Sequence, residues 1–106
     1  MFARSIAFGL KPNCLGAFTR TFEEKVLPIL MQEVGFQEQI TFPTSPTGTD
    51  VIAISLWDTR KQAEAYKTAE YADALESLCK VLNGAPQVWV SDVIISRIHQ
   101  VATVAA

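Results

Sequence analysis

Residues 51–57 constrain the fold more than any other segment, because they are apolar on both sides of an extended chain. The two faces carry Ile52, Ile54 and Leu56 on one side and Ala53, Ser55 and Trp57 on the other. A strand of this kind is typical of a sheet that is covered on both faces. One layer of helices covers only one face, so a second layer has to cover the other.

Three further segments alternate with period two, which predicts strands. They are residues 2–10, residues 36–42 and a last strand from Gln87 to about His99. Residues 43–49 read Pro-Thr-Ser-Pro-Thr-Gly-Thr and predict the turn of a hairpin between the second and third strands.

Two segments carry the helical spacing of three and four residues. The first helix is predicted from Leu15 to Val34, with a kink at Pro28 and a glycine cap at Gly35. Thr59 and Gln62 form a capping box for the second helix, which runs to about Leu82.

The resulting order is βαββαβ, which predicts one α+β domain over residues 1–106 with a ferredoxin-like fold. In this plan a four-stranded antiparallel sheet carries two helices on one face. The other face would then expose apolar side chains of residues 51–57. We therefore expect a homodimer packed through its sheet faces, a dimeric α+β barrel; the alternative is a monomer with an exposed apolar face.

Small side chains raise the question of a cavity. Ala3, Ser5, Ala7 and Gly9 share one face of the first strand. One expectation is that this stripe meets Ala53 and Ser55 under the helices and leaves space for a ligand. The alternative, which packing alone favours, is that the helices sit closer to the sheet there.

Composition excludes several classes of function. The chain is 49% hydrophobic and 19% charged, which excludes disorder, and its net charge of −2 argues against nucleic acid or an anionic membrane as partner. No window provides the roughly 20 apolar residues of a membrane helix. Cys14, Cys79 and His99 do not form a metal motif, so we expect no metal and no cofactor. The two cysteines form no disulfide framework and no signal peptide is recognisable, so we expect a cytoplasmic location.

Several short motifs resemble those of one family. They are residues 26–30 (Val-Leu-Pro-Ile-Leu), residues 35–36 (Gly-Phe), residues 54–58 (Ile-Ser-Leu-Trp-Asp), residues 63–66 (Ala-Glu-Ala-Tyr) and Tyr71. Together they resemble the antibiotic biosynthesis monooxygenase family of the dimeric α/β-barrel superfamily, over nearly the whole chain. The family includes cofactor-independent quinone-forming oxygenases, quinol monooxygenases and haem-degrading oxygenases.

The resemblance and the helical spacing indicate candidate site residues. Trp57 is similar in position to a pocket tryptophan of family enzymes, and Tyr66 could stabilise an oxyanion; both are candidate catalytic residues. Candidate substrate-binding residues are Phe18, Phe22, Ser55 and Tyr71. Each aromatic residue could equally be a core residue. Haem-degrading members of the family use an asparagine on the first strand and a histidine on the second helix, together with the tryptophan. Residues 2–10 of this chain contain no asparagine and residues 60–82 no histidine, so the resemblance does not favour haem breakdown.

Two functions fit these features. The first is a cofactor-free monooxygenase that acts on a small phenolic or quinone-like molecule in a pocket between sheet and helices. Such a substrate reacts with O2 through its own stabilised carbanion, so the protein supplies orientation and hydrogen bonds. The second is a non-catalytic dimeric module that binds a small molecule or acts in a stress response. A purely structural dimerisation domain would have no pocket at all.

Overall fold

Pairing between the first and third strands builds the centre of the sheet. The computed structural model describes residues 1–65 and 69–94. Its strands are β1 (Phe2–Gly9), β2 (Phe36–Pro43), β3 (Asp50–Trp57) and β4 (Gln87–Asp92). They form one antiparallel sheet in the order β2-β3-β1-β4. This confirms the predicted ferredoxin-like α+β fold.

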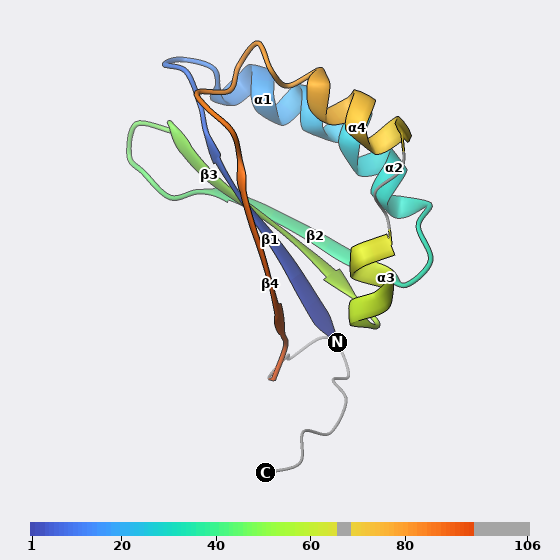
Figure 1. Ribbon diagram of the computed structural model, residues 1–106. Coiled ribbons are helices and arrows are strands. Elements are labelled where there is room, and N and C mark those ends of the chain that lie inside the picture. Colours follow the sequence, from blue (N-terminus) through green and yellow to red (C-terminus); the bar gives the residue numbers. More distant parts are fainter. Residues whose placement is uncertain (66–68, 95–106) are drawn as a thin grey trace.

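The helical segments lie on one side of the sheet (Figure 1). They are α1 (Leu15–Thr21), the π-helical turn η1 (Phe22–Val26), α2 (Leu27–Met31), α3 (Arg60–Ala65) and α4 (Ala69–Glu76). The second helical region is shorter than predicted. After Glu76 the chain continues in tighter turns, with bonds from the N–H of Cys79 to Glu76 and from Val81 to Leu78.

The π-helical turn explains how the first helix accommodates both its proline and its spacing. The side chains of Phe18, Phe22, Val26 and Leu30 recur every four residues, and all four are buried. In an ideal α-helix each such step rotates the stripe by about 40°, so it would leave the core face. The wider π turn counteracts that rotation. It also precedes Pro28, which has no N–H for the helical ladder.

The β1–β3 register assigns each side chain to a face of the sheet. Phe2 pairs with Trp57, Arg4 with Ser55 and Ile6 with Ala53. These residues face the helices, and all are buried. The opposite, outer face carries Ile52, Ile54 and Leu56.

The expectation that the small residues of β1 and β3 form one stripe under the helices is wrong. Ala53 and Ser55 lie under the helices, but Ser5 pairs with Ile54 and Ala7 with Ile52, so the small residues of β1 lie on the outer face. Directly opposite residues of neighbouring strands share a face, and the register is offset by one residue from the one the stripe requires.

The outer face is apolar and open. Ile40, Phe42 and Trp89 keep 42%, 41% and 47% of their surface exposed. Ile40 and Phe42 pair with the half-buried Ile54 and Ile52 of β3, and Trp89 pairs with Ser5 of β1. The prediction that one sheet face exposes apolar side chains is therefore met in this chain.

Gly35 joins α2 to β2 against the start of α3. Its φ of +85° is left-handed, and its carbonyl accepts a 2.8 Å bond from the N–H of Asp58. A methyl group on Gly35 would overlap the amide of Gln62, whose side-chain oxygen is buried without a hydrogen-bond partner among the described residues. The N–H of Gln62 donates to the Thr59 hydroxyl at 3.2 Å, which is one of the two bonds of the predicted capping box; the return bond to the Gln62 side-chain oxygen is not formed.

We predict that Gly35→Ala destabilises the protein more than Gly84→Ala. Gly84 has a similar φ of +88°, but a methyl group there would meet nothing within 4 Å. Gly84→Ala should therefore cost only the left-handed backbone penalty, about 1–2 kcal/mol. Chemical denaturation measures both variants. Measured against Gln62→Ala alone, adding Gly35→Ala should cost much less than it does in the wild type, because the overlapping amide is gone and only the Cβ of residue 62 remains close. An equal cost in both backgrounds would show that the overlap with Gln62 is unimportant.

Candidate functional site

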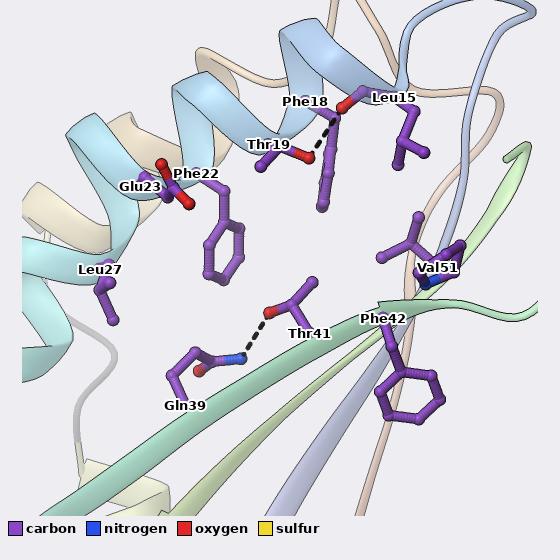
Figure 2. Close-up of a pocket in the computed structure, with 11 residues that line it drawn as sticks. Leu15, Phe18, Thr19, Phe22, Glu23, Leu27, Gln39, Thr41, Phe42 and Val51 are labelled. Atoms are coloured by element: carbon purple, nitrogen blue, oxygen red, sulfur yellow. Dashed lines mark hydrogen bonds between the residues drawn. The ribbon is translucent and has the colours of Figure 1, made fainter.

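A cavity of about 250 Å³ lies between the first helical segment and the edge formed by β2 and β3 (Figure 2). It is on the helix-covered side of the sheet. Its lining residues are Leu15, Phe18, Thr19, Phe22, Glu23, Leu27, Gln39, Thr41, Phe42, Pro43 and Val51. Figure 2 shows the ring of Phe42 below β2, away from the cavity, so the ring itself does not line the cavity.

The helical wall is aromatic. The rings of Phe18 and Phe22 have centroids 5.7 Å apart and are inclined by 33°. Phe8 of β1 supports both, at 5.1 Å from Phe18 and 6.5 Å from Phe22. Ring pairs at these separations hold each other's orientation, so this wall is rigid.

The strand wall is polar. The Gln39 amide donates to the Thr41 hydroxyl at 3.2 Å and to the carbonyl of Ile40 at 3.4 Å. The two bonds hold the amide group along β2, below the helix (Figure 2). Glu23 stands opposite, on the helix beside Phe22. The cavity thus combines an apolar wall with polar groups that can fix the orientation of a ligand.

An irregularity in β2 brings these polar groups inward. Phe36 pairs with Trp57, but the register shifts between Phe36 and Glu38, so Gln39 and Thr41 join the helix-facing side. A bulge inserts one residue and exchanges the faces beyond it. The alternation in the sequence placed Phe36 with Ile40 and Phe42, and in the structure it lies on the opposite face from them.

Trp57 belongs to a separate buried cluster. Its side chain is fully buried, and its indole N–H donates to the Ser55 hydroxyl at 2.9 Å. Ser55 in turn donates to the carbonyl of Arg4 at 3.4 Å. Phe36 packs edge-on against the indole at 5.5 Å. This cluster fixes the end of β3 against β1.

Charged groups border this cluster at the start of α3. The guanidinium of Arg60 lies 5.5 Å from the centroid of the Phe2 ring and 2.9 Å from the Glu64 carboxylate. Its hydrogen bond to Glu64 raises the pKa of Arg60, so this side chain stays charged at any physiological pH. Arg4 is buried on the helix-facing side of the sheet. The alternation of residues 2–10 places it on the same face as Phe2 and Ile6, but nothing in the sequence indicates a role for it.

The structure separates the predicted site residues. Phe18 and Phe22 line the cavity, whereas Trp57 and Ser55 do not. Tyr66 lies outside the described residues, and Tyr71 belongs to α4 with its side chain outside what the structure describes. The roles of all six residues stay predictions. The sequence does not indicate Glu23, Gln39 and Thr41 as site residues. Their position beside the cavity depends on the bulge in β2 and on how the helix packs over this strand.

Two further observations bear on function. Among the described residues, no group of three or more His, Cys, Asp or Glu side chains could hold a metal ion. His99 lies outside this part of the chain. Within residues 1–65 and 69–94, no helix has the length and hydropathy needed to cross a membrane.

Solved structures share this fold. The chain superimposes on an antibiotic biosynthesis monooxygenase with a TM-score of 0.72 and 14% identity, over 90% of this chain and 100% of that one. It superimposes on SnoaB, a cofactor-independent oxygenase from Streptomyces nogalater, with a TM-score of 0.76 and 9% identity, over 92% and 97% of the two chains. A protein of unknown function from Nitrosomonas europaea, NE2512, gives 0.75 and 12%, over 93% and 94%.

These likenesses confirm the resemblance of the fold to antibiotic biosynthesis monooxygenase structures. No family model matches the sequence, and no curated protein matches it either. At identities of 9–14% the common property is the backbone architecture. Function has to be argued from the site.

We predict that the Trp57–Ser55 hydrogen bond contributes about 1 kcal/mol to stability, as buried neutral bonds do. Ser55→Ala should destabilise the native protein by that amount or more, whereas the same change in a Trp57→Phe background should cost less. The four denaturation curves of this double-mutant cycle give the coupling directly. A coupling near zero would mean that the bond does not hold the indole.

Proposed function

We propose that this protein is a cofactor-independent monooxygenase that acts on a small phenolic or quinone-like molecule. The observation that carries the proposal is the cavity between helix and sheet, with its Phe18–Phe22 wall facing Gln39 and Thr41. The fold, shared with a cofactor-independent oxygenase, supports the general kind of activity.

The size of the cavity restricts the substrate. Cavities of about 150 Å³ accept benzene, and typical ligand pockets begin near 300 Å³. A volume of about 250 Å³ therefore suits one aromatic ring with short substituents. A molecule of several fused rings would need the helix to move away from β2.

The chemistry follows from the residues on the two walls. The substrate ring would pack against the apolar helical wall, where Phe18 and Phe22 expose only a small part of their surface, and the amide and hydroxyl groups of β2 would bind its oxygen substituents. An electron-rich phenolate or its carbanion can react with O2 directly. One oxygen atom enters the substrate and the other leaves as water, so the substrate itself supplies the electrons. The protein's contribution is orientation and stabilisation of negative charge.

We also propose that the protein works as a homodimer whose sheets pack face to face. The support is the exposed apolar outer face around Ile40, Phe42 and Trp89. Monomers rarely expose such a continuous apolar surface. The cavity lies on the opposite side of the sheet, so this association leaves its helical wall accessible.

The same cavity favours one alternative, a non-catalytic binding module. Among the described residues that line it, no nucleophile–base pair or metal-ligand set is present. A binding module would take up the same one-ring molecules without turnover. Binding and oxygen consumption therefore have to be measured separately.

We predict that the purified protein, treated with a chelator, consumes O2 in the presence of a one-ring quinol and that Thr41→Phe abolishes this by filling the cavity. Val88→Phe is the matched control, because Val88 is an exposed strand residue that does not line the cavity. An oxygen electrode and calorimetric binding provide the two readouts. Binding without oxygen consumption supports the binding module, and neither signal in the wild type rejects both functions.

Trp57→Phe and Tyr66→Phe test the candidate catalytic residues in the same assay. If either side chain takes part in turnover, the variant should lose most oxygen consumption at a temperature where its circular dichroism spectrum is still native. Trp57→Phe should also lower the melting temperature by several degrees, because it removes the hydrogen bond to Ser55. Unchanged turnover in both would assign these residues to the core.

We predict that Phe42→Glu converts the dimer into a monomer, since it places a charge on the apolar outer face, along its β2 edge. Val34→Glu is the control: this residue is 77% exposed but lies between α2 and β2, off the sheet face. Sedimentation velocity distinguishes the two states. A monomeric wild type, or a Phe42→Glu variant that still dimerises, would contradict the face-to-face arrangement.

A further inference from the structure

The cavity carries a negative charge on its helical wall and neutral polar groups on its strand wall. Glu23 is the one ionisable side chain among the described residues that line it. No lysine or arginine of that lining balances the carboxylate. Arg60 pairs with Glu64 on the far helical segment, and Glu23 forms no such ion pair with another described residue.

The position of Glu23 is set by the helix. The π-helical turn begins at Phe22, so Glu23 follows directly on the residue that forms the aromatic wall. Figure 2 shows Glu23 beside Phe22 on this wall, with Gln39 and Thr41 across the cavity. A ligand between the two walls therefore has the exposed Glu23 carboxylate on the helix side and neutral hydrogen-bonding groups on the strand side.

We propose that this cavity selects aromatic molecules that carry a positively charged amine and discriminates against those that carry a carboxylate. The inference rests on the proposed function, because it assumes that the cavity binds a one-ring phenol. An ammonium group would form an ion pair with Glu23, which lines the cavity. A carboxylate at the same place would be repelled by the charge of Glu23.

Neighbouring charges do not reverse this preference. Arg20 and Lys25 lie on the same helical segment, but neither lines the cavity. Both are exposed, as Glu23 is, so water and salt screen all three charges; Glu23 acts on a bound ligand because it is the one that lies against the cavity. On the strand side the lining groups are an amide and a hydroxyl, which carry no net charge.

Three phenols of similar size test the proposal: tyramine, neutral 4-ethylphenol and 4-hydroxyphenylacetate. Isothermal titration calorimetry at low salt measures their affinities for the wild-type protein. We expect tyramine to bind up to about fivefold more tightly than 4-hydroxyphenylacetate, the size of effect that one exposed charge provides. Higher salt should reduce this ratio by screening.

Glu23→Gln should bring the affinities of the two charged probes within about twofold of each other and leave that of 4-ethylphenol unchanged. Glu24→Gln is the matched control. It removes the same charge from the adjacent position, but Glu24 is exposed and does not line the cavity. It should preserve the wild-type ratio, which separates a local effect of Glu23 from the net charge of the protein.

The outcomes separate this inference from the proposed function. If 4-ethylphenol binds and is excluded by Thr41→Phe, but the charged probes bind equally, the cavity is a binding site and the charge selection is wrong. An equal loss of preference in Glu23→Gln and Glu24→Gln also overturns the selection by Glu23. If none of the three probes binds to the wild type, both the inference and the proposed use of the cavity fail.

Discussion

The rest of the structure depends on the antiparallel pairing of β1 with β3. It joins residues about 50 positions apart, from Phe2 opposite Trp57 to Gly9 opposite Asp50, and holds the two strands at the centre of the sheet. Because side chains alternate between faces, a shift of one residue would move Arg4 and Ile6 out of the core and bring Ser5 and Ala7 in. The register thereby decides which side chains the helices cover and which remain on the open face.

The two ends of the helix-covered side have different roles. At one end Trp57, Ser55 and Phe36 pack without space, and hydrogen bonds continue from the indole to the backbone of β1. At the other end the helix stands away from β2, where Gln39 and Thr41 are too small and too polar to fill the gap below Phe18 and Phe22. The rigid end supports the sheet, and the open end leaves room for a ligand.

Two irregularities of the backbone create this arrangement. The bulge at the start of β2 turns Gln39 and Thr41 inward while Phe36 still faces the helices. The π turn η1 keeps a four-residue repeat on the core face and places Phe22 and Glu23 together on the cavity wall. Both features are local departures from regular geometry, which commonly occur next to functional sites.

The sequence alone determined the order of the elements, the antiparallel sheet and the apolar outer face, because periods of two and of about 3.6 residues follow from backbone geometry. Through its helical spacing it also placed Phe18 and Phe22 on the core-facing side of the first helix. The tertiary structure decided the place of the cavity and the inward position of Gln39, Thr41 and Glu23. These depend on a one-residue bulge and on how closely the helix approaches β2, and such features arise from packing between distant segments, which no local pattern records.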